Sequence, residues 1–276
     1  MDFLVAGGDR RAAHLARLLR ARGLDARAVG LERSGLDGVV SAPLESAAEA
    51  DWVLLNSPIK CELAEKPFGL GQLLTHLQPG ARLIFCGPHI PPAGLERFCV
   101  HDLMQKEDFL CRNAELTAEG ALFAAMRAQE RALMDCRCLV VGWGRIGRAL
   151  AERLVALGAS VTVASRSERG MRQAQARGAQ AVETARLAEA LPGKELVFST
   201  PPFPVLDEKT LANADSGACL IDLASPPYGI DLEAAHRLGL RAWREPGLPG
   251  RFCPESAALA LAAGIEDICK GGGKDD

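Results

Sequence analysis

The chain lacks the features that mark several classes of protein. No apolar run approaches the roughly 18 residues of a membrane span, and the N-terminus carries neither the basic nor the long apolar segment of a signal peptide. Basic residues form no stripe and the formal net charge is -3, so we do not expect a nucleic-acid partner. These absences favour a globular, cytoplasmic protein that handles a small molecule.

The cysteines show no metal-binding spacing. There are nine of them and no CxxC pair, and the one CxC, Cys136 and Cys138, leads into an expected strand. Structural zinc sites use closely spaced pairs, and secreted disulfide scaffolds usually have an even count. We therefore expect reduced thiols in a cytosolic protein, and no metal site.

Short apolar runs alternate with amphipathic helical patterns along the chain, which is typical of βαβ units and parallel sheets. We predict the α/β class, with two Rossmann-like parallel-sheet domains joined by a long helix and a C-terminal helix. Residues 1–116 are expected to form an N-terminal substrate domain. Residues 117–253 are expected to form a dinucleotide-binding domain, whose long first helix begins at Thr117 as its N-cap. Residues 254–270 are expected to form a C-terminal helix able to pack back on the N-terminal domain, with a disordered tail at 271–276.

A glycine-rich turn follows the apolar run at 138–141 and opens a helical pattern. In this GxGxxG pattern, Gly142 permits a tight turn, Gly144 lets the backbone approach a pyrophosphate, and Gly147 allows the helix to pack closely on the strand. The helix N-terminus then offers free N–H groups to the phosphates. Because both flanks fit, the motif predicts dinucleotide binding rather than an empty glycine-rich turn. The residues expected at the cofactor here are Gly142, Trp143, Gly144, Arg145, Ile146 and Gly147.

The next strand ends in Ser165, Arg166 and Ser167, where a site specific for NAD usually has an acid that binds the ribose hydroxyls. An acid would repel a 2′-phosphate, whereas Arg166 can bind it through charge-assisted hydrogen bonds, with the two hydroxyls helping. The alternative is a solvated Arg166, or one that stacks on adenine while the protein uses NAD. We predict NADP as the cofactor, with NAD possible.

Later strand ends are expected to face the same crevice, because ligands of open α/β sheets bind at the carboxyl ends of strands. The cofactor contacts expected there are Thr200, Pro201, Pro202, Leu223, Ala224 and Ser225. Asp222 precedes the last three and is either a site residue or a turn residue. A stiff loop after the last strand is expected near the nicotinamide, unless it is a plain turn; it comprises Gly247, Leu248, Pro249 and Gly250.

With these motifs placed, the chain resembles the A subunits of dipicolinate synthase. The resemblance spans nearly the whole length. Its blocks at 222–225 and 246–250 are the more specific, because generic dinucleotide folds lack them. The blocks that carry it are Gly7-Gly8-Asp9-Arg10, Asn113 with Thr117-Ala118-Glu119-Gly120, Gly142–Gly147, Ala164-Ser165-Arg166-Ser167, Asp222-Leu223-Ala224-Ser225 and Pro246-Gly247-Leu248-Pro249-Gly250.

The resemblance implies a reaction and a partner. That family oxidises a cyclic tetrahydrodipicolinate derivative to dipicolinate, the calcium chelator of bacterial endospores. In that family, the A subunit resembles a nicotinamide-binding protein that works with a flavoprotein-like B subunit. The protein would act in the cytoplasm of the mother cell of a sporulating bacterium, and we also expect a homo-oligomer.

A dicarboxylate substrate needs cationic or N–H donors, and loss of a ring proton needs a base. The substrate-binding candidates are Arg10, Asn56, Ser57, Lys60, Lys106, Arg112, Asn113 and Arg251, together with the 247–250 loop. For catalysis the candidates are His89, which follows the apolar run at 82–86, Glu119 and Asp222, with His101 as a rival. Each has an ordinary alternative: a solvated surface residue, or a helix cap for Glu119.

Two other functions stay open. A two-domain 2-hydroxy-acid or amino-acid dehydrogenase would have a similar plan, but it usually needs an Arg and a His–acid pair in the cofactor domain, where we find only His236. Because residues 56–100 match the family poorly, a non-catalytic NADP-binding regulatory subunit is the third hypothesis.

Overall fold

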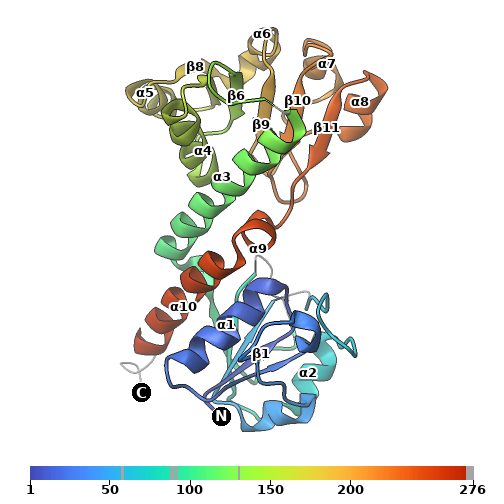
Figure 1. The fold of residues 1–276 in the computed structure, drawn as a ribbon, viewed down its shortest axis with the longest axis vertical. Helices are drawn as coiled ribbons and strands as arrows, with labels where there is room; N and C mark the ends of the chain where they lie inside the picture. The colour runs from blue at the N-terminus through green and yellow to red at the C-terminus, as the bar shows by residue number, and fades with distance from the viewer. Residues whose placement is uncertain (57–58, 88–89, 91–92, 130, 272–276) are drawn as a thin grey trace. The chain divides into compact units, whose positions relative to one another are not determined.

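The protein consists of two compact α/β units in this computed structural model (Figure 1). Unit 1 combines Met1–Asn113 with Pro249–Asp276, and unit 2 is the single stretch Ala114–Leu248. The structure describes residues 1–56, 59–87, 90, 93–129 and 131–271.

Unit 1 is built on a parallel sheet with the strand order β2-β1-β3-β4-β5. Its central strands β1 and β3 are buried at every position, as expected for apolar strands covered on both faces. The strands are β1 (Phe3–Ala6), β2 (Ala26–Val29), β3 (Trp52–Leu55), β4 (Arg82–Phe85) and β5 (Cys99–Asp102). The short helical segments besides α1 are η1 (Glu32–Ser34), η2 (Leu44–Glu49), α2 (Leu70–His76) and η3 (Leu103–Gln105).

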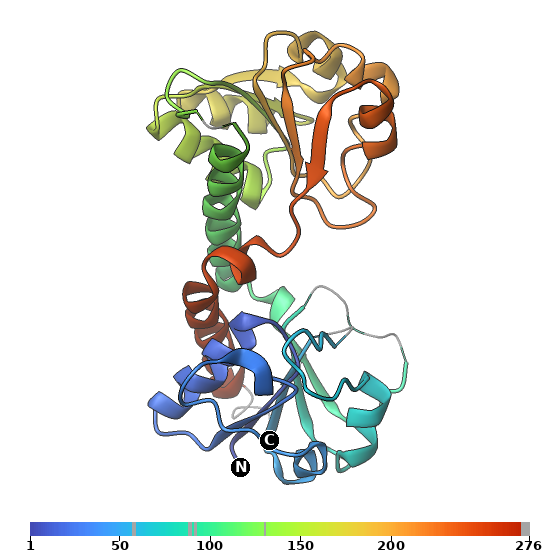
Figure 2. The same ribbon diagram turned by 45° about the vertical axis from the view of Figure 1, so that its right-hand side comes forward.

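The C-terminal helix α10 (Pro254–Gly271) packs along α1 (Arg10–Ala21), and both views show the two helices side by side (Figures 1 and 2). Buried small and branched side chains of α10 face this contact or the core; they include Ala257, Ala258, Leu261, Ala262 and Ile265. Two ion pairs join the helices at their exposed edge, Arg17 with Glu255 and Arg22 with Glu266. Residues far apart in the sequence thus complete one core.

The long helix α3 runs over Glu107–Gln129, so the prediction that it begins at Thr117 is wrong. Thr117 is buried in the body of the helix and is not its cap. The first turn holds Glu107 and Asp108, whose charges favour a helix N-terminus, and no glycine or proline interrupts residues 107–116. Among the described helices, including α3 and α10, none is both long and apolar enough to cross a membrane.

Unit 2 is built on a second parallel sheet, with the order β11-β10-β9-β6-β7-β8. Its strands are β6 (Arg137–Val141), β7 (Ser160–Ser165), β8 (Gln180–Glu183), β9 (Leu196–Ser199), β10 (Cys219–Asp222) and β11 (Arg241–Arg244). The helical segments are α4 (Arg145–Ala156), α5 (Glu168–Ala176), η4 (Thr184–Arg186), α6 (Leu187–Ala190), α7 (Glu208–Leu211) and α8 (Leu232–Arg237). The two parallel sheets confirm the predicted α/β class.

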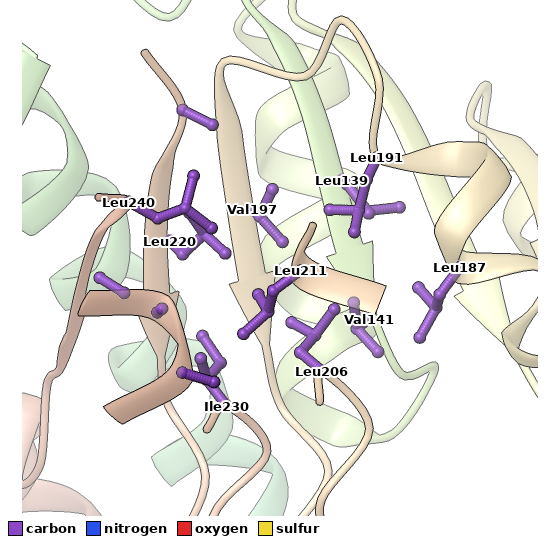
Figure 3. Close-up of a cluster of buried hydrophobic side chains, with 14 of the residues drawn as sticks. Leu139, Val141, Leu187, Leu191, Val197, Leu206, Leu211, Leu220, Ile230 and Leu240 are labelled. Atoms are coloured by element: carbon purple, nitrogen blue, oxygen red, sulfur yellow. The ribbon is translucent and has the colours of Figure 1, made fainter. Parts of the chain in front are cut away.

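One face of the second sheet carries an apolar core in which Val141, Val197 and Leu220 point from three neighbouring strands toward the covering helices (Figure 3). Leu206, Leu211 and Ile230 close it from the segments that follow β9 and β10. This packing fixes the carboxyl ends of β6, β9 and β10, where the candidate site lies.

Candidate active site

The carboxyl ends of β6 and β9 form a switch point in unit 2. The chain passes from β6 to β7 on one side of the sheet and returns to β9 on the other. Open α/β sheets bind ligands in the crevice at such a point. A cleft of about 530 Å³ opens there. Its lining residues are Gly142, Trp143, Gly144, Ser165, Arg166, Ser167, Thr184, Thr200, Pro201, Pro202 and Phe203.

The glycine-rich turn fits a dinucleotide pyrophosphate. Gly142 has a φ of +98°, and a Cβ atom on it would lie 2.5 Å from Oγ1 of Thr200. A Cβ atom on Gly147 would clash with the carbonyl oxygen of Gly142, so only glycine allows α4 to pack this closely on the turn. Gly144, by contrast, has no described atom within 4 Å of the Cβ position. The backbone is therefore open at the one place where a phosphate has to approach it.

Trp143, Arg145 and Ile146 have different surroundings. The Trp143 indole Nε1 donates to Oε1 of Gln173 at 3.1 Å, which holds the ring at the cleft beside α5. Arg145, the first residue of α4, is exposed, and Ile146 is half-buried.

Arg166 stands at the far end of the cleft, after β7. Its guanidinium carbon lies 4.6 Å from the centre of the Phe203 ring, a cation–π contact that holds the exposed side chain beside the cleft. None of the described lining residues is an acid. This end of the cleft therefore offers a positive charge and no carboxylate to a ribose phosphate.

The two serines beside Arg166 serve the turn itself. Ser165 is buried, and its hydroxyl bonds to the backbone of Ser167, donating to the carbonyl oxygen at 3.3 Å and accepting from the N–H at 3.3 Å. The Ser167 hydroxyl accepts from the N–H of Gly170 at 3.0 Å and caps α5. Both hydroxyls thus hold the turn that presents Arg166. Because the Ser167 hydroxyl only accepts here, its own O–H can still donate, and the prediction that the hydroxyls help to bind a phosphate stays a prediction.

Thr200 and Asp222 hold the two later strand ends. The Thr200 hydroxyl donates to the carbonyl oxygen of Val141 at 2.8 Å, which ties the proline turn at 201–202 to the end of β6. The Asp222 carboxylate is buried and accepts from three backbone N–H groups, those of Ala224 at 3.1 Å and of Gly229 and Ile230 at 3.0 Å each. Asp222 was a candidate catalytic residue. Since both of its oxygens are used within the protein, it instead folds the loop at 223–230.

We expect Asp222→Asn to lower the free energy of unfolding by about 2–4 kcal/mol, because an amide nitrogen would then face a backbone N–H donor in a buried place. Thermal or urea unfolding measures this. Asp231→Asn is the matched control: Asp231 caps α8 by accepting from the N–H of Ala234 at 2.9 Å, and asparagine caps equally well. Equal stabilities of the two variants would contradict the role given to Asp222.

The loop that Asp222 folds carries an aromatic–cation pair that sequence reasoning missed. Tyr228 has a φ of +73°, unusual for a residue with a side chain. Its ring lies 3.8 Å from the guanidinium carbon of Arg244, at the end of β11. Leu223, Ala224 and Ser225 lead into this loop, and the Leu223 N–H donates to the carbonyl oxygen of Ser199 at 2.8 Å. No local sequence signal marks this pair, since its members lie on separate strand ends.

Unit 1 has its own switch point, between β1 and β3, and there the structure brings together Asp9, Arg11 and Asn56. Arg10, a predicted carboxylate ligand, is instead exposed on the first turn of α1. Lys60 is exposed beside Glu62 at 3.8 Å, while its carbonyl oxygen accepts from the N–H of Gly8 at 2.7 Å.

The 247–250 segment is not a plain loop, because Leu248–Phe252 form the short helix α9. Gly247 precedes the helix with a φ of +66°, and Leu248 is buried within it. Pro249 and Gly250 belong to unit 1, and a Cβ atom on Gly250 would lie 2.7 Å from both Nε of Arg11 and Oδ2 of Asp9. Two blocks that carry the family resemblance, 7–10 and 246–250, therefore meet at this ion pair.

The remaining catalytic candidates lie apart from the cleft or outside the described residues. His89 and Ser57 are outside them. Glu119 is exposed in the body of α3 and pairs with Arg153 at 3.5 Å, so it is neither a helix cap nor part of the cleft lining. His101 lies in β5, 5.3 Å from the Trp52 ring.

Burial, and then the charges of Lys106 and Arg82, lower the pKa of His101. Of the other substrate candidates, Lys106, Arg112 and Arg251 are exposed, and Asn113 is half-buried in α3. The His236 ring bonds to the carbonyl oxygen of Ala242 at 3.3 Å, and no acid pairs with it among the described residues. It therefore does not supply the His–acid pair of a 2-hydroxy-acid dehydrogenase.

The fold and the cleft define a class of protein, and sequence comparison agrees. A family model described as NADP oxidoreductase, coenzyme F420-dependent, matches residues 137–226, which hold the glycine-rich turn and the strand ends around the cleft. The chain is an NAD(P)-dependent oxidoreductase with a Rossmann-type domain, as predicted.

A particular relative matches both units. The chain is 26% identical to the A subunit of dipicolinate synthase from Bacillus subtilis (strain 168) over 279 residues, which cover 95% of this chain and 93% of that protein. The crystal structure of the corresponding dipicolinate synthase protein from Bacillus halodurans superposes with a TM-score of 0.84 at 24% identity, covering 97% of each chain. A transhydrogenase from Sinorhizobium meliloti shares the fold with a TM-score of 0.73 at 18% identity, covering 97% of this chain and 93% of that one. The predicted resemblance to the A subunits of dipicolinate synthase is confirmed.

Proposed function

We propose that this chain is the nicotinamide-binding A subunit of a dipicolinate synthase, which oxidises a cyclic (4-hydroxy-)tetrahydrodipicolinate or dihydrodipicolinate to dipicolinate with NADP. The observation that carries the proposal is the match to the A subunit of the Bacillus subtilis enzyme, which runs through both units. A nicotinamide cleft alone would fit many oxidoreductases. By the same resemblance, the chain would work with a B subunit in the cytoplasm of a sporulating bacterium.

The residues of unit 2 fit the cofactor in a definite order. Gly144 and the N-terminus of α4 would hold the pyrophosphate, Arg166 the 2′-phosphate, and the turn at 200–202 would lie along the nicotinamide half. Bound NADP⁺ would supply the hydride acceptor. The absence of an acid from the described lining supports NADP over NAD, because an acid would repel the phosphate.

The substrate ring has to lose water, then a hydride and a proton, and it becomes aromatic in doing so. Aromaticity makes the oxidation favourable, so the protein's task is to orient the ring and to bind its two carboxylates. Positive groups that match two carboxylates are therefore expected in unit 1, the proposed substrate domain.

We expect the purified chain, mixed with the freshly cyclised product of aspartate semialdehyde and pyruvate and with its B subunit, to form NADPH and an ultraviolet-absorbing pyridine dicarboxylate in equal amounts. Absorbance and chromatography measure the two products. Omitting the chain, and replacing NADP⁺ with NAD⁺, are the controls. Intact NADPH binding without any product would favour a non-catalytic NADP-binding protein instead.

A further inference from the structure

The switch point of unit 1 lies where a Rossmann domain would bind a dinucleotide, but a side chain of the protein already caps the helix there. Asp9 caps α1, and its carboxylate accepts from the N–H of Arg11 at 3.0 Å. A carboxylate thus occupies the helix N-terminus at which a pyrophosphate would sit. This crevice is suited to a different ligand.

Arg11 is held in a fixed orientation. Its Nε donates to Oδ1 of Asp9 at 2.9 Å and to Oδ2 at 3.1 Å, and its Nη2 donates to Oδ2 at 2.7 Å. Burial opposes the charge of each group, but the hydrogen bonds and attraction between them outweigh it; the pKa of Asp9 is lowered and that of Arg11 is raised. Both groups therefore stay charged at neutral pH.

Asp9 uses only one edge of the guanidinium. Nη1 of Arg11 donates to no acceptor among the described residues, although the side chain is only 22% exposed. A planar guanidinium with one edge pinned offers its other edge to a second carboxylate in bidentate geometry.

Asn56 directly follows β3. It lines the same narrow cavity as Arg11 and Cys86, with room of about 20 Å³ for a single water. The Asn56 amide is half-buried, and no hydrogen bond of its side chain occurs within the described part of the chain. Burial raises the pKa of the Cys86 thiol to about 12, so Cys86 adds no negative charge that would repel an anion.

Gly250 closes the other side of the pair. Because a Cβ atom there would lie 2.7 Å from both Nε of Arg11 and Oδ2 of Asp9, α9 approaches this edge as closely as the backbone allows. The pinned edge is shielded and the Nη1 edge is left for a ligand.

We propose that Arg11, together with the Asn56 amide, binds one carboxylate of the substrate, and that Asp9 and Gly250 position the guanidinium for it. The inference rests on the proposed function, because the dicarboxylate comes from it. Arg10, the adjacent residue that the sequence alone favoured, takes no part.

The test is titration of pyridine-2,6-dicarboxylate into the full chain loaded with NADP⁺, by calorimetry. We expect Arg11→Gln to raise the Kd about tenfold to a hundredfold, and Arg11→Lys to raise it less, because lysine keeps the charge but loses the fork. Gly250→Ala leaves both charged groups in place but crowds the pair, and should raise the Kd about fivefold. The matched control Arg20→Gln, exposed on the same helix, should leave it unchanged.

NADPH affinity and thermal unfolding are measured alongside, because a merely structural Arg11 would lower stability without changing dicarboxylate affinity. Wild-type binding that Arg11→Gln does not weaken would overturn this inference and leave the proposed function standing. A larger loss in Arg10→Gln than in Arg11→Gln would overturn it too. If the wild-type chain binds no dicarboxylate and forms no product with its B subunit, the proposed function fails first, and this inference with it.

Discussion

Replacing Arg166 with glutamate is expected to weaken NADPH binding about a hundredfold or more and to change NADH binding only a few-fold. A guanidinium–phosphate contact contributes about 1.5–3 kcal/mol, and the new carboxylate adds repulsion of the phosphate. NADH has no 2′-phosphate, so neither effect reaches it. Fluorescence titration with the two dinucleotides measures the change in preference.

Arg172→Glu is the matched control for this experiment. Arg172 is an exposed arginine of α5 that pairs with Glu168 at 2.6 Å, and it does not line the cleft. We expect the Arg172→Glu variant to bind NADPH and NADH with nearly unchanged affinity. Equal losses of NADPH and NADH binding in Arg166→Glu would show instead that Arg166 stacks on adenine, which both cofactors share.

Two alanine substitutions in one turn are expected to separate stability from cofactor binding. Gly147→Ala forces a methyl group into the carbonyl oxygen of Gly142, which is backbone and cannot move aside. We expect it to cost about 3 kcal/mol of unfolding free energy, with loss of NADPH binding. Gly144→Ala has free space and a φ of -81°, which alanine adopts readily. Its stability should stay within about 1 kcal/mol of wild type.

The informative result is the behaviour of Gly144→Ala, whose methyl group would occupy the place where the pyrophosphate meets the backbone. We expect NADPH affinity to fall at least about tenfold in a protein with normal thermal unfolding. Wild-type affinity in this variant would mean that the phosphates lie elsewhere, and the assignment of the turn would have to be abandoned. Each variant serves as the control for the other.

Local signals explain what could be predicted from the sequence. The glycine spacing between strand and helix marks the turn at 142–147. Only glycine allows the tight turn, the approach of a phosphate to the backbone and the close packing of the helix on the strand. The sequence places Ser165 and Ser167 beside Arg166, but it does not reveal the hydrogen bonds that their hydroxyls make within the turn. The direction of a short side chain depends on the fold of the turn, which residue type does not specify.

The sequence does not reveal which side of a helix a residue faces, nor which distant residues come into contact. Whether Arg10 or Arg11 turns inward follows from where α1 begins, and Asp9 as its cap settles this. Strand β5 has no buried position, so it shows no apolar run that would reveal it. Tyr228 and Arg244 meet only after the sheet has formed.

The split of unit 1 into two stretches has a consequence for synthesis of the protein on the ribosome. Unit 2 is continuous and complete once Leu248 has emerged, so it can fold while translation continues. Synthesis of unit 1 begins first, but unit 1 is completed after unit 2, because the apolar side of α1 is covered by α10, which follows Leu248 in the sequence. During that interval a nascent apolar surface is uncovered, which is the situation that chaperones protect. A product that stops after Leu248 can therefore complete unit 2, but it carries unit 1 without its second stretch.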